Sequence, residues 1–208
     1  MPRLGVTQQT AVLRANVVEV ADSLLAEDSL PAPAGVARLV LLMGLPASGK
    51  SHFAGLLADR VSGVVVATDA LRRRLFIAPS YGRAESATVF AVAHALAQRL
   101  LERGHVVIVD ATNLRESHRA PLYALAKAAS APAILVRVVA PESAIRERLT
   151  LRAARSSPAD ASDADWAIYQ LMVERQEEPS RPYLTVDSGG DLQTELARVE
   201  EAIRTASA

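Results

Sequence analysis

The sequence predicts an α/β domain in which helices cover both faces of a five-stranded parallel sheet, giving a three-layer α/β/α sandwich. Two observations lead to this fold class. Five short, predominantly apolar segments, of the kind that parallel sheets bury on both faces, alternate with longer segments of helical periodicity. The chain has 208 residues, of which 50% are hydrophobic and only 4% aromatic, which suits a single core of helices packed on a sheet.

Charge and cysteine content narrow the possible functions. The formal net charge is zero, so no overall field attracts nucleic acid or a membrane surface. The absence of cysteine excludes disulfides, thiolate zinc sites and cysteine nucleophiles. No stretch approaches the roughly 20 apolar residues of a membrane span, and the N-terminus lacks the apolar region of a signal peptide. We therefore expect a cytoplasmic protein.

Residues 7–27 have apolar side chains at helical spacing, and Pro31 and Pro33 end this segment. Because it precedes the first apolar strand, we expect residues 1–35 to form a helical extension and linker, and residues 36–208 to form the main domain. The extension is expected to pack on the flank of the sheet. A helix that binds a partner or covers the substrate is the alternative.

The first strand, residues 39–43, runs into Gly44-Leu45-Pro46-Ala47-Ser48-Gly49-Lys50-Ser51, and His52 follows. This Gly-x-x-x-x-Gly-Lys-Ser pattern between a strand and a helix is a P-loop. Its backbone N–H groups point at phosphate oxygens at the positive end of the helix dipole. Lys50 would reach the terminal phosphates, and the Ser51 hydroxyl would bind Mg²⁺. Residues 44–52 are thus predicted to bind ATP.

The second strand, residues 64–67, ends in Thr68-Asp69-Ala70-Leu71-Arg72. The carboxyl ends of parallel strands form the ligand crevice, so Asp69 should lie beside the phosphates and accept a proton from an attacking hydroxyl. Arg72, one helical turn later, could hold the acceptor. The alternative is that Asp69 only caps the next helix. The connector at residues 76–83 lies where an acceptor pocket could form.

A helix predicted over residues 84–103 leads to the third strand, residues 106–109, which delivers Asp110 to the same edge. A carboxylate there is typical of a Walker B aspartate, which binds Mg²⁺ directly or through water. Asn113 offers a polar group to the acceptor or to the loop. Arg119 falls on the following helix near the crevice and is a further candidate for acceptor binding.

The fourth strand, residues 133–139, precedes a helix that opens at Pro141 and contains Arg148, Arg152 and Arg155. Arg148 and Arg152 are four residues apart and share one face. Cations over the β- and γ-phosphates stabilise phosphoryl transfer, so residues 141–176 are predicted to form an arginine-bearing lid. The fifth strand, residues 183–186, precedes a loop expected near adenine and a final helix to about residue 204.

Taken together, this order of motifs resembles the kinase domain of polynucleotide 5′-hydroxyl kinases. It is equally similar to zeta-toxin-like and seryl-tRNA-kinase-like P-loop kinases over residues 38–187. The resemblance implies that Asp69 is the general base, that Arg72 contacts the acceptor, and that Arg148 and Arg152 belong to a lid over ATP. Position 47 is Ala where many relatives have Gly, which should be tolerated if its φ is not positive. His52 replaces a small residue and is expected to pack or hydrogen-bond rather than bind metal.

The sequence therefore predicts an ATP- and Mg²⁺-dependent kinase in which Lys50 and Asp69, with Arg148 and Arg152, carry catalysis. The acceptor would be a hydroxyl, with a small molecule favoured over a polynucleotide or tRNA because the net charge is zero. A nucleotide-binding regulatory module without catalysis is the alternative from another class.

Overall fold

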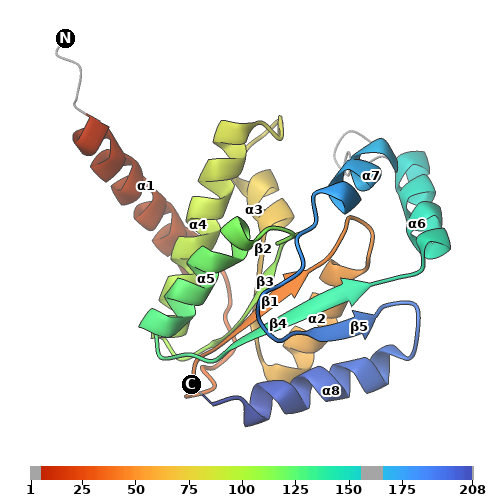
Figure 1. Cartoon of the computed structure of the whole chain (residues 1–208). Coiled ribbons are helices and arrows are strands. Elements are labelled where there is room, and N and C mark those ends of the chain that lie inside the picture. The colour runs from red at the N-terminus through yellow and green to blue at the C-terminus, as the bar shows by residue number, and fades with distance from the viewer. Residues whose placement is uncertain (1–5, 156–165, 208) are drawn as a thin grey trace.

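The structure, a computed structural model, describes residues 6–155 and 166–207, with side chains placed in residues 16–26, 28–151 and 166–207. Its centre is a five-stranded sheet of β1 (Arg38–Met43), β2 (Val64–Ala67), β3 (Val106–Asp110), β4 (Ala133–Val139) and β5 (Leu184–Asp187). The strand order is β2-β3-β1-β4-β5, and every pairing is parallel. The predicted five-stranded parallel sheet is confirmed, and β1 lies at its centre (Figure 1).

Helices cover both faces of this sheet, as the periodicity predicts. Their bounds are α1 Val6–Glu27, α2 Lys50–Val61, α3 Thr68–Leu75, α4 Arg83–Glu102, α5 Glu116–Ala128, α6 Glu142–Arg155, α7 Trp166–Glu174 and α8 Leu192–Thr205. Helices α2 and α8 pack on one face, and α1, α3, α4 and α5 lie on the other side (Figure 1). The three-layer α/β/α architecture is thus also confirmed.

Side chains along each strand point alternately to the two faces of the sheet, and this divides the core into two hydrophobic clusters. Leu39, Leu41 and Met43 of β1 point into the cluster with α4 and α5, whereas Val40 and Leu42 point toward α2 and α8. Successive side chains of a strand face opposite sides of the sheet. Because both sides of the sheet are covered, the strands are predominantly apolar, most completely in β1, β2 and β3, which makes such segments recognisable in the sequence.

Helix α1 extends beyond the rest of the molecule at its N-terminal end, but its last turns join the core (Figure 1). Ala21, Leu24 and Leu25 are buried in the same cluster as α4. Arg99 of α4 forms an ion pair with Asp22 at 3.2 Å. The helix therefore packs on the flank of the sheet layer, as expected from its spacing. The domain boundary at residue 35 stays a prediction.

Helices α6 and α7, which fall within the predicted lid, lie at the end of the sheet where β4 finishes (Figure 1). Ile145 and Leu149 of α6 and Tyr169 of α7 form a small hydrophobic cluster together with Ala47 of the P-loop. Trp166 stacks on Tyr169 with ring centroids 4.6 Å apart. These helices thus contact the P-loop directly.

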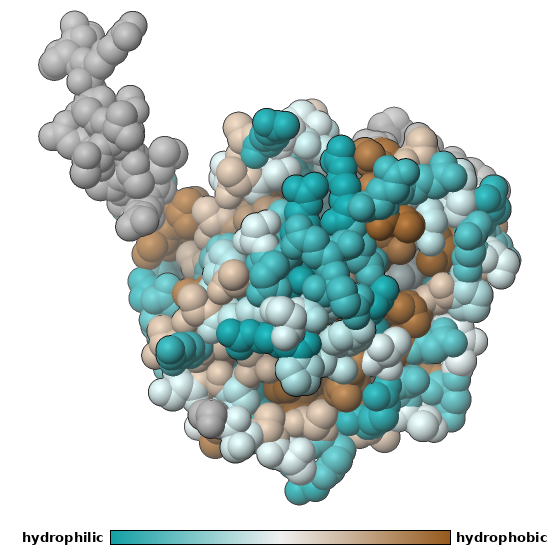
Figure 2. Space-filling model, viewed as in Figure 1, coloured by the Kyte–Doolittle hydropathy of each residue, from teal (hydrophilic) through white to brown (hydrophobic). Residues whose placement is uncertain are grey.

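The surface seen in Figure 2 is mostly hydrophilic. Hydrophilic residues gather near its middle, where Figure 1 draws the segment between α7 and β5, and the hydrophobic areas are small and separate. In the part of the chain that the structure describes, no helix is both long and apolar enough to cross a membrane.

The packing of α1 predicts that Leu25→Ala will destabilise the whole domain. Leu25 is 7% exposed, so its truncation leaves a cavity and should lower the free energy of unfolding by about 2–4 kcal/mol. Val18 of the same helix is 38% exposed, and Val18→Ala should change it by less than about 0.5 kcal/mol. Urea denaturation of both variants makes the comparison. Equal, small effects would mean that α1 is independent of the core.

Candidate active site

The P-loop connects β1 to α2, and two glycines allow its shape. A Cβ atom on Gly44 would lie 2.4 Å from the carbonyl oxygen of Val138, so only glycine permits this close approach to β4. Gly49, the residue before α2, has φ +95°, and a Cβ there would lie 2.8 Å from the Ser188 side chain. Both positions therefore require glycine, for reasons of space at Gly44 and of space and conformation at Gly49.

The backbone of Ala47 is in the left-handed region, with φ +59°, so the condition under which alanine was expected to be tolerated here is not met. This conformation costs a residue with a Cβ about 1–2 kcal/mol. In return, the Ala47 side chain is buried against Ile145 and Leu149 of α6. A methyl group that glycine lacks thus joins the P-loop to the lid helices, and its burial offsets part of the backbone strain.

Lys50, Ser51 and Asp110 meet where the P-loop passes the end of β3. Lys50 is buried, and its Nζ donates a 2.8 Å hydrogen bond to the carbonyl oxygen of Leu45, across the loop. Burial raises the pKa of the Asp110 carboxyl, while a hydrogen bond from Ser51 and the charge of Lys50 act in the opposite direction. The pair of a buried carboxylate and a neighbouring hydroxyl fits the ligand preference of Mg²⁺.

Asp69 lies in the first turn of α3, directly after β2. Ala67, two residues before it, pairs with Asp110 across β2 and β3, and the charge of Asp69 is one of the smaller causes that raise the pKa of Asp110. The residue that caps α3 is Ala67, and it makes no side-chain cap bond, so Asp69 is not the helix cap of the alternative interpretation. The Asp69 side chain is exposed at the carboxyl edge of the sheet. This position leaves the carboxylate accessible to a substrate.

Arg72 lies one turn beyond Asp69, but its guanidinium is buried and pairs with the carboxylate of Glu85. It also donates to Ser86 and lies over the ring of Tyr81, 4.6 Å from its centroid. Contact between Arg72 and an acceptor stays a prediction, and it would require this pairing to loosen.

Glu85 organises the connector between α3 and α4. Its carboxylate accepts 2.7 Å hydrogen bonds from the backbone N–H and the hydroxyl of Ser80, and a 3.2 Å bond from the N–H of Tyr81. Burial acts to raise the pKa of Glu85, but these bonds and Arg72 outweigh it and lower the pKa to about 2. The connector beside Asp69 is therefore held in a defined shape by one buried carboxylate.

Asn113 and Arg119 are both buried beneath the carboxyl ends of β1 and β3. The Asn113 amide donates to the carbonyl oxygen of Leu42 at 2.8 Å. Arg119 is 0% exposed, and it donates to the carbonyl oxygen of Asn113 at 2.9 Å and to Glu116 at 3.0 Å. In this arrangement both side chains support the loop after β3. Binding of an acceptor by either one stays a prediction.

Arg148 of α6 reaches the P-loop. It donates to the carbonyl oxygen of Ala47 at 3.1 Å and to the hydroxyl and carbonyl oxygens of Ser188, at 3.0 and 3.3 Å. The side chains of Arg152 and Arg155 lie outside the described residues, so their predicted contacts with ATP stay predictions. Pro46 and Ser48 are buried within the loop, and Leu45 is half-buried. His52 is exposed, so of the two roles expected for it, packing is not met and a hydrogen bond stays a prediction.

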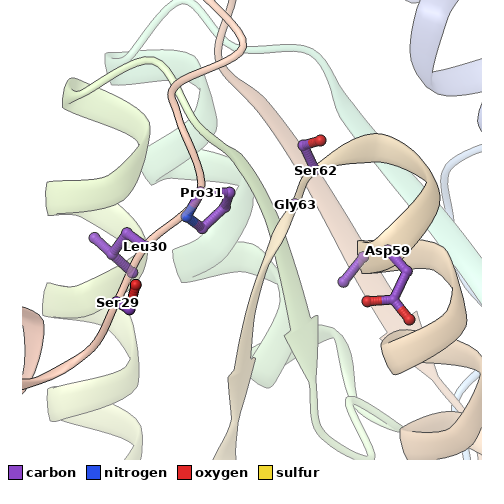
Figure 3. Close-up of a pocket in the computed structure, with 7 residues that line it drawn as sticks. Ser29, Leu30, Pro31, Asp59, Ser62 and Gly63 are labelled. Atoms are coloured by element: carbon purple, nitrogen blue, oxygen red, sulfur yellow. The ribbon is translucent and has the colours of Figure 1, made fainter.

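A cavity of about 460 Å³ lies at the opposite end of α2 from the P-loop (Figure 3). Ser29, Leu30 and Pro31 of the linker line one side of it, and Asp59, Ser62 and Gly63 line the other. It is built around the turn that enters β2, whereas the predicted site residues lie where the strands end. This cavity therefore does not belong to the candidate active site.

Two residues of the site were not among the sequence candidates. Glu85 lies three positions after Gly82, the residue that precedes α4. A glutamate at this position often accepts hydrogen bonds from N–H groups that precede the helix. This spacing is the sequence feature from which the role of Glu85 could have been predicted. Ser188 lies in the loop that was assigned to adenine, but nothing in its sequence context indicates contacts with Ser48 and Arg148.

The buried position of Asp110 predicts a specific dependence of stability on pH. Because its pKa is raised in the folded state, the folded protein holds this proton more tightly than the unfolded chain. The free energy of unfolding should therefore fall as pH rises from about 4 through the raised pKa. Asp110→Asn should remove the decrease that is caused by deprotonation of Asp110. Urea denaturation between pH 4 and pH 7, without Mg²⁺ or nucleotide, tests it. Exposed Asp22→Asn is the control, and identical profiles for wild type and Asp110→Asn would contradict the assignment.

Comparisons with known proteins agree with this geometry. Residues 39–179 match the family described as an AAA domain. An uncharacterized protein of Mycobacterium tuberculosis strain H37Rv is 32% identical over 149 residues, and a protein of Mycobacterium bovis matches equally. These matches include 62% of this chain, which spans about 30% of the length of the relatives.

Solved structures share the fold at lower sequence identity. Kti12 of Chaetomium thermophilum, solved with ADP-AlF3, has a TM-score of 0.66 and 23% identity, covering 82% of this chain and 99% of that one. The APS kinase CysC of M. tuberculosis, with AMPPNP and APS, has a TM-score of 0.64 and 20% identity over 82% and 99%. A gluconokinase of Sinorhizobium meliloti has a TM-score of 0.55 and 22% identity over 80% and 95%. The chain belongs to the AAA domain family, and its fold is that of P-loop kinases.

Proposed function

We propose that the protein transfers the γ-phosphoryl group of ATP to a hydroxyl group, in a reaction that requires Mg²⁺. The observation that carries this proposal is the position of Asp69, an exposed carboxylate in the first turn of α3, two residues beyond Ala67, which pairs with Asp110 across β2 and β3. A protein that only binds nucleotide needs no carboxylate at this place. A kinase needs one to accept the proton of the attacking hydroxyl.

The other site residues would bind the phosphates and Mg²⁺ and would stabilise charge during transfer. The P-loop N–H groups and Lys50 would hold the phosphates of ATP. Ser51 and Asp110 would hold Mg²⁺, which would neutralise charge on the phosphates during transfer. Arg152 would add a positive charge near the transferred group from the lid side, and Arg148, which donates to the carbonyl oxygens of Ala47 and Ser188, would add positive charge beside the P-loop. Most of the rate enhancement would come from positioning and electrostatics rather than from covalent chemistry.

We favour a small-molecule acceptor over a polynucleotide or tRNA. Arg72, the cation nearest to Asp69 along α3, is buried and paired with Glu85, so it does not present a free charge to a phosphate backbone. The net charge of zero provides no general attraction for nucleic acid. Two proteins of the same fold are named for small molecules, an APS kinase and a gluconokinase, which supports the same choice.

A regulatory module that binds ATP without transferring phosphate is the alternative from a different class. It would retain the P-loop contacts and the lid but would have no use for Asp69. The two functions therefore predict different products with the same purified protein.

The proposal predicts that Asp69→Asn abolishes transfer without abolishing ATP binding. Loss of a general base should lower the transfer rate about 10²–10⁴-fold, while the Kd for ATP stays within about twofold of wild type because Asp69 is not a phosphate ligand. The assay follows γ-labelled ATP in Mg²⁺ buffer, offered separately a 5′-hydroxyl oligonucleotide and a cell metabolite extract.

Asp59→Asn is the matched control, because Asp59 is an exposed aspartate at the far end of α2. It should transfer at the wild-type rate. Full activity in Asp69→Asn would remove the base assignment. Bound ATP with no labelled product in the wild type would favour the regulatory alternative.

A further inference from the structure

Ser188, in the loop between β5 and α8, joins the P-loop to the lid helix α6. Its hydroxyl donates a 2.6 Å hydrogen bond to the carbonyl oxygen of Ser48 and accepts one from Arg148 at 3.0 Å. Arg148 also donates to the carbonyl oxygen of Ala47 at 3.1 Å. A serine and an arginine from two distant segments thus hold consecutive carbonyl groups of the same loop.

These bonds determine where the N–H groups of the loop point. The chain contains no cis peptide bond in the described residues, so the C=O and N–H of each peptide point in opposite directions. Because the carbonyl oxygen of Ser48 is held by Ser188, the N–H of Gly49 is directed to the opposite side of that peptide. Gly49 directly precedes α2, where backbone N–H groups of a P-loop meet phosphate oxygens.

The Ser188 side chain also lies close to Gly49, the second residue of this peptide. A Cβ atom on Gly49 would lie 2.8 Å from both Cβ and Oγ of Ser188, and 3.4 Å from Nη1 of Arg148. The Ser188 backbone is also fixed, because its N–H donates to the carbonyl oxygen of Val139 at 2.9 Å, at the end of β4. The serine is therefore a rigid support on the carbonyl side of the Ser48–Gly49 peptide.

We propose that Ser188 is a positioning residue of the nucleotide site, which holds the Ser48–Gly49 peptide with its N–H toward the phosphates and attaches Arg148 to it. The bonds occupy the carbonyl side of the loop and leave the N–H side for the ligand, so they are compatible with bound ATP. This inference rests on the nucleotide site of the proposed function, but not on phosphoryl transfer.

The test compares two isosteric variants, Ser188→Thr and Ser188→Val, which differ in the hydroxyl group alone. The ligands are Mg²⁺-AMPPNP and Mg²⁺-tripolyphosphate, because the second binds through phosphate groups without a base or a sugar. Calorimetry gives the Kd of each. Ser188→Val should raise the Kd of both ligands by the same factor of about ten. This is the size expected for one hydrogen bond that orients a donor toward a charged group. Ser188→Thr should stay within about twofold of wild type.

Trp166 provides a second readout, because it is the only tryptophan of the chain and lies on α7 against Tyr169. Its fluorescence change on adding Mg²⁺-AMPPNP should require about tenfold more ligand in Ser188→Val than in Ser188→Thr. Asp191→Asn is the control for general loosening of the same loop, since Asp191 caps α8 through the N–H groups of Gln193 and Thr194. It should lower thermal stability while leaving both Kd values unchanged.

Several results would overturn the proposal. Equal Kd values for the Thr and Val variants would show that the hydroxyl does not position the loop. Tighter binding by Ser188→Val would show that the bonds hold the site closed against nucleotide. If Asp191→Asn raised both Kd values as much as Ser188→Val does, Ser188 would have only a structural role. If Ser188→Val does not fold, Ser188→Ala takes its place in the same comparison. A wild type that binds AMPPNP but transfers no phosphate would refute the proposed function alone, whereas one that binds neither ligand would refute both.

Discussion

The site depends on how the carboxyl end of β1 is held between its two neighbours. From the β3 side, the carbonyl oxygen of Thr112 accepts the N–H of Gly44, and the amide of Asn113 donates to the carbonyl oxygen of Leu42. From the β4 side, the backbone at Val138 lies so close to Gly44 that no Cβ fits. The P-loop therefore leaves the sheet from a point fixed on both sides. This fixed start allows backbone N–H groups to serve as a preformed phosphate site.

The same end of the sheet also holds the segment that follows α7. After α7, Glu177 accepts the N–H of Glu116 through its carboxylate, at 2.7 Å, and donates its own N–H to the carbonyl oxygen of Leu114 at 2.9 Å. Arg119 lies beneath these contacts and also bonds to the loop after β3. One buried arginine thus contacts both the loop that follows Asp110 and the segment that follows α7, where it donates to the carbonyl oxygen of Glu177 at 3.5 Å.

The strands and the P-loop could be predicted because their signals are local. A strand buried on both faces is short and apolar, and the spacing of Gly44, Gly49 and Lys50 is set within a few residues. The partners of long side chains are not local. Arg72 pairs with Glu85, and Arg119 supports the loop at Asn113, contacts that the positions of these arginines in the sequence do not indicate. The φ of Ala47 also escaped prediction, because the burial that offsets its strain comes from α6, about 100 residues further along.

The methyl group of Ala47 has a further consequence for the energetics of the lid. Opening of the predicted lid, by movement of α6 and α7 away from the P-loop, would expose Ala47, Ile145 and Leu149 to water. Exposure of apolar surface carries a positive heat capacity change, so the enthalpy and entropy of opening both vary with temperature. A glycine at position 47 would expose less apolar surface and flatten this variation. The burial of the Ala47 methyl group would thus make the enthalpy and entropy of lid opening depend on temperature.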